Sequence, residues 1–186
     1  MFEILLYNMN VQRKKSKQLI SMAIYQLMLT IPYEKITVKM ICEKAGVSRM
    51  SFYRYYSTKE DVFINFADER FEEFYETYMT NEITLDSFTR DVISYFKKYN
   101  RQVKILEKAN CMSILITQFE RYAAYIMRNA KSLSVFQYHN NPLAVPYYAG
   151  AFYNVLVYWS KNNFKHSEEE MTRMLEELLT TRVPLN

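Results

Sequence analysis

Residues 37–61 read T-V-K-M-I-C-E-K-A-G-V-S-R-M-S-F-Y-R-Y-Y-S-T-K-E-D, which is the pattern of two short helices hinged at Gly46. One small core can be closed by the apolar residues of this stretch, namely Val38, Ile41, Cys42, Ala45, Val47 and Phe52. The second helix then has side chains without an inward role: Arg49, Met50, Ser51, Tyr53 and Arg54. A helix that packs at one side and presents polar side chains at the other suits the major groove of DNA.

Helix caps divide this stretch into elements. Thr37 is expected to cap a helix over 38–44, and Ser48 a helix over 49–55. Gly46 between them suits a turn that needs a positive φ. Ser57 and Glu60 have the spacing of a capping box, which predicts a long fourth helix that runs to about Thr80. A first helix is predicted over about 11–30, after an apolar arm at residues 1–10.

The composition favours an all-α protein with short connections. The 186 residues include only two Gly and four Pro, so few positions break a helix. Further helices are predicted at about 84–99, 101–109, 113–130, 147–162 and 168–180, with a loop over 131–146. Ser167 and Glu170 form a second capping box. We therefore predict a helix-turn-helix bundle over 1–60, joined by a connector helix to a C-terminal domain over 61–186.

Charge is divided unevenly along the chain. Residues 1–60 carry ten Lys and Arg against four Asp and Glu, whereas residues 61–186 carry fourteen against sixteen. The net charge of the first part is therefore +6 and that of the second is −2. A basic end favours a polyanionic partner, although basic residues that only solubilise the first helices would give the same count.

Enzymatic and metal-binding classes find little support in the sequence. The two histidines, His139 and His166, do not stand at ligand spacing, and two glycines cannot build a phosphate loop. We predict no catalytic residue, no metal and no cofactor. Cys42 and Cys111 both lie in apolar surroundings, which favours a reduced, cytoplasmic setting. The longest uncharged run, residues 132–160, contains Asn, His, Pro and many Tyr, so it is expected to be a buried core segment and not a membrane span.

The register of residues 13–66 resembles the TetR family of bacterial transcriptional regulators. The resemblance rests on Ala45-Gly46-Val47-Ser48, on Phe52-Tyr-Arg-Tyr-Tyr-Ser-Thr-Lys-Glu60, and on the lead-in Tyr33-Glu-Lys-Ile-Thr-Val38. It implies a cytoplasmic homodimer, a repressor whose paired recognition helices read a palindromic operator in double-stranded DNA. It also implies a small effector bound in the C-terminal domain.

Positions carried over from the family give the expected DNA contacts. Thr37, Tyr53, Tyr55 and Lys59 resemble its backbone-phosphate contacts, and Arg49, Met50 and Ser51 resemble its base-facing positions. Lys39 and Arg54 complete the predicted set. Met50 stands where the family often has Gly or another small residue, so its side chain either touches a thymine methyl or simply clears the groove.

The C-terminal part gives two broader expectations. Aromatic and apolar side chains could line a cavity for an apolar or aromatic ligand, or could fill a core; they are Phe96, Tyr99, Leu115, Phe119, Tyr122, Tyr125, Tyr148, Phe152 and Tyr153. The expected dimer interface comprises Leu156, Trp159, Met171, Met174, Leu175 and Leu178. The alternative function is a co-regulator of the same fold that is controlled by a partner protein rather than by a small effector.

Overall fold

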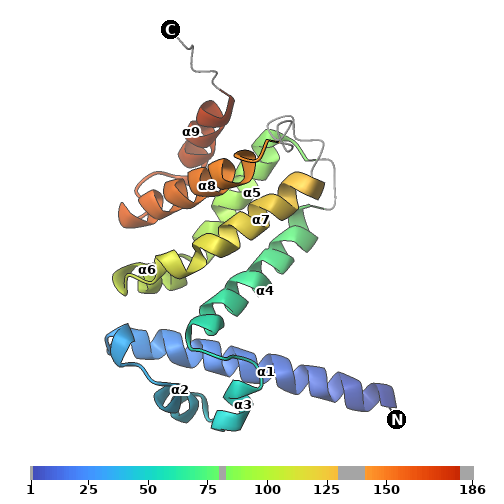
Figure 1. The fold of residues 1–186 in the computed structure, drawn as a ribbon. Coiled ribbons are helices and arrows are strands. Elements are labelled where there is room, and N and C mark those ends of the chain that lie inside the picture. Colours follow the sequence, from blue (N-terminus) through green and yellow to red (C-terminus); the bar gives the residue numbers. More distant parts are fainter. Residues whose placement is uncertain (1, 80–82, 130–140, 181–186) are drawn as a thin grey trace.

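A computed structural model describes residues 2–79, 83–129 and 141–180, with the side chains of residues 2–10 excepted. Every regular element in these ranges is helical, as the low content of Gly and Pro predicts. Figure 1 shows α1, α2 and α3 together at one end of the molecule and α5, α7, α8 and α9 at the other. The connector helix α4 (Glu60–Tyr78) runs obliquely between the two groups.

The first helix is longer than the sequence predicts. α1 spans Phe2–Met28, so the backbone of residues 2–10, to which the sequence assigns no defined structure, continues the helix. Its buried face carries Ile20, Ala23 and Ile24, at the spacing of one helical stripe. A 3₁₀ turn, η1 (Tyr33–Lys35), follows and leads the chain toward α2.

The hinge of the helix-turn-helix forms as its residues predict. α2 spans Val38–Ala45, and Thr37 Oγ1 accepts a hydrogen bond from the Met40 amide at 3.3 Å. Gly46 then adopts a φ of +66°, a left-handed conformation that an L side chain rarely takes. The Val47 amide donates back to the Cys42 carbonyl at 3.0 Å, which closes the end of α2.

Ser48 begins the next helix by accepting the Ser51 amide at 3.0 Å. α3 spans Arg49–Tyr53, two residues shorter than the predicted 49–55. It is anchored by Phe52, which is fully buried, and by the neighbouring Tyr56, whose ring lies 5.4 Å from that of Phe52.

The predicted capping box before α4 is wrong in its pairing. Ser57 and Glu60 do not cap the helix; instead the Ser57 and Thr58 amides both donate to Asp61 Oδ2 at 2.8 Å. Thr58 Oγ1 accepts the Asp61 amide at 3.3 Å. The Glu60 carboxylate instead accepts a hydrogen bond from the Tyr33 hydroxyl at 2.6 Å. The reciprocal pair at the start of α4 is therefore Thr58 with Asp61, one residue further along the chain than the sequence predicts.

The far end of the molecule is a bundle of helices. It contains α5 (Leu85–Lys98), α6 (Asn100–Lys108), η2 (Met112–Leu115), α7 (Ile116–Asn129), α8 (Ala144–Lys161) and α9 (Glu168–Thr180). α7 packs along α8, and α5 packs along α9. Most of the predicted loop over 131–146 lies outside the described residues, and α8 begins inside its predicted end, at Ala144.

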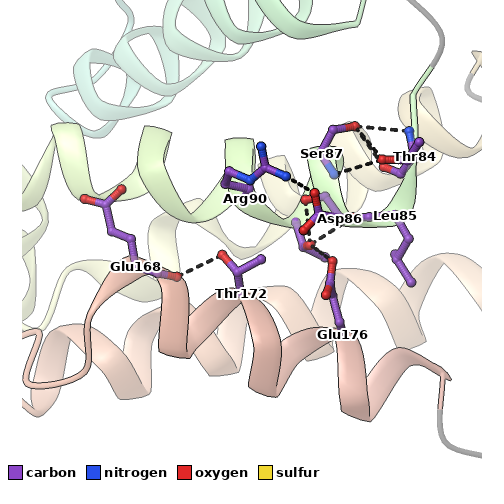
Figure 2. Close-up of polar contacts among 9 residues, drawn as sticks. Thr84, Leu85, Asp86, Ser87, Arg90, Glu168, Thr172 and Glu176 are labelled. Carbon is purple, nitrogen blue, oxygen red and sulfur yellow. Dashed lines mark hydrogen bonds and ion pairs between the residues drawn. The ribbon is translucent and has the colours of Figure 1, made fainter.

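A buried side-chain hydrogen bond joins α5 to α9. Figure 2 shows Thr84 and Ser87 bonded to each other at the start of α5, while Glu176 reaches across from α9. The buried hydroxyl of Thr89 donates to Glu176 Oε1 at 2.9 Å.

The predicted capping box at the start of α9 is confirmed: the Ser167 amide donates to Glu170 Oε2, and Ser167 Oγ accepts a hydrogen bond from the Glu170 amide.

The two ends of the molecule share their packing. The core under α1, α2 and α3 also contains Val103 and Leu106 of α6 and Met112 of η2. Lys17 of α1 lies 3.5 Å from the Glu69 carboxylate of α4. The helix-turn-helix is therefore packed on the C-terminal helices rather than attached through α4 alone.

Candidate functional site

The exposed face of α3 is the first candidate site. Met50 is 74% exposed and Tyr53 58% exposed, and both flanking arginines, Arg49 and Arg54, are exposed as well. Exposed apolar side chains of this size are not explained by packing within the chain. Because Phe52 anchors the same helix from below, the face is held outward in a fixed orientation.

Three other predicted contact residues each make a side-chain contact within the chain. Thr37 is exposed, and its hydroxyl caps α2. Ser51 is half-buried, with its hydroxyl 3.0 Å from that of Ser48. Tyr55 is half-buried and packs edge-on against Tyr56, at a ring separation of 6.4 Å.

Lys39 lies on the solvent side of α2. Its ammonium is 3.8 Å from the Glu43 carboxylate, and both side chains are 65% exposed. Ion pairs of this kind contribute little, typically below about 1 kcal/mol. Lys39 therefore remains available to an outside anion.

Lys59 is turned inward instead. Its ammonium donates to the Tyr33 carbonyl at 2.8 Å and to the Ile36 carbonyl at 3.0 Å. It also lies 4.0 Å from the centroid of the Tyr33 ring. Since a lysine has three N–H donors, one is left over. The side chain ties the start of α4 to the segment before α2, a structural role that the sequence does not predict.

A cavity inside the molecule is the second candidate site. It has a volume of about 210 Å³ and lies where α1, α4, α5, α6, η2, α7 and α8 meet. Of the nine residues predicted for a pocket, seven line it: Phe96, Tyr99, Leu115, Phe119, Tyr122, Tyr148 and Phe152. Tyr125 and Tyr153 stand outside the lining; Tyr125 is 41% exposed and packs on Tyr75, and Tyr153 packs on Phe119.

The sequence prediction missed the part of the lining that α1 and α4 supply. Tyr25 of α1 lines the cavity, as do Phe66 and Arg70 of α4. One signal was present in the sequence, because Arg70 interrupts an otherwise aromatic stripe along α4. The contribution of α1 had no such signal, since it follows from the packing of α1 against α6.

Tyrosine hydroxyls of the lining differ in their partners. Tyr122 Oη donates to Asp68 Oδ1 at 2.8 Å, and burial together with this carboxylate raises the Tyr122 pKa well above its ordinary value. Tyr25 Oη, by contrast, has no hydrogen-bond partner among the described residues, and its side chain is 8% exposed. Burial raises the Tyr25 pKa well above its usual range, so this hydroxyl keeps its proton at neutral pH.

Arg70 presents a similar case. Its Nη1 lies 3.3 Å from both the Tyr99 hydroxyl and the Glu73 carboxylate. Its Nε is buried and has no hydrogen-bond partner in the described part of the chain. The guanidinium also lies 5.3 Å from the Phe66 ring centroid.

The predicted dimer interface needs correction. Leu156, Trp159, Met171 and Leu175 are at most 3% exposed because they fill the core of the C-terminal bundle. They cannot present their side chains to a second chain. Met174 is half-buried, and Leu178 is 67% exposed.

An exposed apolar stripe lies instead on the outer face of α8. Leu143 precedes the helix and is 69% exposed, Tyr147 is 64% exposed and Tyr158 is 61% exposed. Their spacing of four and eleven residues places them on one side of the helix.

Other kinds of site are not found in the described ranges. No group of His, Cys, Asp and Glu residues there could hold a metal ion. None of the described helices combines the length and the apolar character that crossing a bilayer requires.

Two sequence families match the chain. Residues 22–65 match the family described as bacterial regulatory proteins, tetR family, and residues 83–181 match one described as transcriptional regulator C-terminal region. A comparison with curated protein sequences gives no significant match.

Solved structures of the same fold include three with similar lengths. One is assigned to the TetR family of transcriptional regulators, from Syntrophomonas wolfei strain Goettingen, with 18% identity and a TM-score of 0.59, covering 93% of this chain and 99% of that one. The fatty acid degradation regulator FadR from Bacillus halodurans has 17% sequence identity and a TM-score of 0.58, and the match covers 91% of this chain and 96% of that one. The dihydroxyacetone kinase operon activator DhaS has 16% sequence identity and a TM-score of 0.55, and the match covers 88% of this chain and 93% of that one. At these identities the likeness establishes the fold.

Proposed function

Because the chain belongs to the tetR family of bacterial regulatory proteins, and so is a DNA-binding transcriptional regulator, we propose that it is a ligand-responsive repressor. It binds a palindromic operator as a homodimer, and a small molecule in the inner cavity changes its affinity for that operator. The protein acts in the cytoplasm by binding DNA and catalyses no reaction.

The observation that carries this proposal is the outward face of α3. Met50 and Tyr53 are more than half exposed on a helix whose other side is fixed by the buried Phe52. Exposed arginines at both ends of the helix supply positive charge and hydrogen-bond donors. An α-helix with such a face fits the major groove of B-DNA.

The residues divide into two proposed roles. Arg49, Met50 and Ser51 face the bases, and Thr37, Lys39, Tyr53, Arg54 and Tyr55 contact the phosphate backbone. The remaining N–H of Lys59 adds a phosphate contact from a side chain that is already held in place by two carbonyls. Phosphate contacts position the protein, whereas base contacts carry sequence preference.

We infer that the homodimer forms through the outer face of α8 together with the end of α9. Leu143, Tyr147 and Tyr158 supply the α8 part, and Leu178 with the half-buried Met174 supplies the α9 part. Exposed aromatic and apolar side chains at helical spacing are typical of a surface that is covered in the assembled state. A two-fold dimer pairs the same surface of both chains and so presents two recognition helices to a palindrome.

Titration of the purified protein onto fluorescent DNA from its own upstream region tests the proposal. The expected result is binding by two chains per site, with an affinity that falls steeply as salt rises because counterions are released from the phosphates. The matched control is scrambled DNA of the same length and composition, which should bind at least about tenfold more weakly.

A transcriptional reporter with the same upstream region decides the direction of control. Repression predicts a higher signal when the gene for this protein is deleted, and activation predicts a lower one. The absence of DNA binding in any salt would exclude direct regulation. Binding that appears only after a second protein is added would favour the partner-controlled co-regulator.

A further inference from the structure

The inner cavity has a mainly aromatic and apolar lining that contains three buried side-chain donors without a hydrogen-bond partner among the described residues; one of them is the Tyr95 hydroxyl, which lies beside the Tyr99 ring. The other two are Tyr25 Oη and Arg70 Nε. Leaving a buried polar group unpaired is unfavourable, and native proteins seldom do so without a reason. Such groups in one cavity point to a ligand that supplies their partner.

Tyr25 and Arg70 lie next to the same aromatic ring. The Tyr25 ring centroid is 5.7 Å from that of Phe66, and the Arg70 guanidinium is 5.3 Å from it. Phe66 is therefore a common neighbour of the two donor side chains, and the rest of a ligand bound to them would extend among the aromatic side chains of the lining.

The chemistry of the donors selects the ligand's polar group. An arginine Nε can only donate a hydrogen bond, and the Tyr25 hydroxyl has its proton to offer. The partner must therefore be an acceptor, and a carboxylate matches a guanidinium better than a neutral oxygen does.

The local charge favours an anion as well. Glu73 is shared between Arg70, at 3.3 Å, and Lys98, at 2.7 Å. Two positive side chains therefore surround one carboxylate, which leaves one positive charge without a partner in this cluster. A ligand with a single negative charge would balance it.

We propose that the effector is a mainly apolar monoanion, a medium-length aliphatic or small aromatic carboxylate, whose acceptor oxygens are held by Tyr25 and Arg70. This inference rests on the proposed ligand-responsive function. The volume of about 210 Å³, that of roughly seven water molecules, limits the ligand to a small acid.

The position of Tyr25 connects the ligand to the DNA-binding end. Tyr25 belongs to α1, whose neighbouring residues Ile20 and Ile24 form part of the core under α2 and α3. A ligand oxygen bonded to Tyr25 therefore contacts the helix-turn-helix bundle directly. Because Arg70 belongs to α4, the same ligand would contact both α1 and the connector helix α4.

Isothermal titration of the full-length protein with octanoate, 1-octanol and octylamine tests the ligand class. These probes have the same chain length and differ in the charge of one end. Octanoate should bind at least about tenfold more tightly than 1-octanol, because its hydrogen bonds are charge-assisted. Octylamine should bind more weakly than either, since its ammonium would meet Arg70. Equal binding of octanoate and 1-octanol, or no binding of any probe, would overturn the inference.

Variants separate the donors from the rest of the lining. Tyr25→Phe keeps the ring and removes the unpaired hydroxyl, so it should raise the melting temperature of the free protein and lower octanoate affinity about three- to tenfold. Tyr122→Phe is the matched control: its hydroxyl is already bonded to Asp68, so the melting temperature should fall and the preference for octanoate over 1-octanol should remain.

Arg70→Met should abolish the preference for octanoate over 1-octanol while 1-octanol still binds. The control Arg90→Met, at an exposed position on α5, should leave the preference intact. If the Arg70→Met protein still preferred octanoate over 1-octanol, the inference would be wrong. A loss of 1-octanol binding as well would indicate a damaged cavity, in which case Tyr25→Phe decides.

Operator binding measured in the same samples distinguishes the two proposals. Selective octanoate binding without any change in DNA affinity would support the ligand class and contradict ligand-responsive repression. Salt-dependent operator binding with no selectivity among the probes would leave DNA binding standing and overturn the ligand class.

Discussion

The ammonium of Lys59 donates a hydrogen bond to the Tyr33 carbonyl at 2.8 Å and lies 4.0 Å from the centroid of the same residue's ring. Two interactions with one residue, and a third with the Ile36 carbonyl, fix the start of α4 against the segment that precedes α2. A lysine expected to contact DNA is thus first a part of the structure that holds the helix-turn-helix in place.

Lys59→Met should therefore lower the stability of the protein itself. Hydrogen bonds to a charged group are worth about 1.5–3 kcal/mol, so a loss of about 1–3 kcal/mol in the free energy of unfolding is expected. Urea unfolding monitored by circular dichroism measures it. The matched control, Lys35→Met, changes an exposed lysine on η1 and should alter stability by less than about 0.5 kcal/mol. Unchanged stability of Lys59→Met would show that the contacts of this lysine do not stabilise the fold.

Arg49→Ala should relax the choice of operator sequence. Arg49 is exposed at the first position of α3, and a base contact made by an arginine is worth about 1–3 kcal/mol of discrimination. Binding to the operator and to single-base variants of it measures the change. A uniform loss across all sequences would assign Arg49 to the phosphate backbone.

Met50 can be tested with DNA that lacks one methyl group. If its side chain touches a thymine, replacing that thymine by deoxyuridine should weaken binding of the wild type by about 0.8 kcal/mol, the value of one buried methyl. The Met50→Ala variant should not distinguish the two DNAs. Because Met50 is 74% exposed, the stability of the variant should stay at the wild-type value. Equal binding of both DNAs by the wild type would mean that Met50 only clears the groove.

Tyr158→Glu should disrupt the proposed dimer. Tyr158 is 61% exposed on the outer face of α8, and burying a charge there in an apolar interface would cost about 2 kcal/mol or more. Light scattering after size-exclusion chromatography should show a monomer at concentrations where the wild type is a dimer. Met22→Glu, at a residue 57% exposed on α1, is the control and should leave the mass unchanged. A dimeric Tyr158→Glu protein would place the interface elsewhere.

Acid should destabilise the protein partly through Glu107. Burial raises the pKa of this carboxyl, but hydrogen bonds from Ser160 Oγ at 2.6 Å and Lys104 Nζ at 3.0 Å outweigh burial and hold the pKa below its ordinary value of 4.5. A lowered pKa gives stability that is complete above the unfolded-state pKa and is lost as the pH falls through the folded-state pKa.

The loss linked to Glu107 should thus begin below about pH 5 and grow as the pH is lowered further. Glu107→Gln should be less stable than the wild type at pH 7, by about 1–2 kcal/mol, and should show a smaller further loss of unfolding free energy at pH 4. Denaturant unfolding at the two pH values gives both numbers. Parallel losses in the two proteins would show that other carboxylates dominate.

Local patterns in the sequence determined the helical elements and most of their caps. Thr37, Gly46 and Ser48 each act through neighbours within five residues, so their roles follow from the order of residues alone. Phe52 and Met50 are assigned to opposite faces of α3 by the helical period, and the structure places them so. The residues that match the family pattern and the basic residues of 1–60 also lie close together in the chain. They therefore identify the DNA-binding end without knowledge of the tertiary structure.

Tertiary structure decided what depends on contacts between distant segments. Glu60 is bonded to Tyr33, 27 residues earlier in the chain, and not to Ser57 as the local pattern predicts. Trp159 and Leu175 belong to the core and not to a dimer face, because α7 covers α8 and α5 covers α9, which no periodicity can specify. Tyr25 and Arg70 meet the same ring from helices more than forty residues apart. A helical stripe tells which side of a helix is apolar, but only packing decides what that side faces.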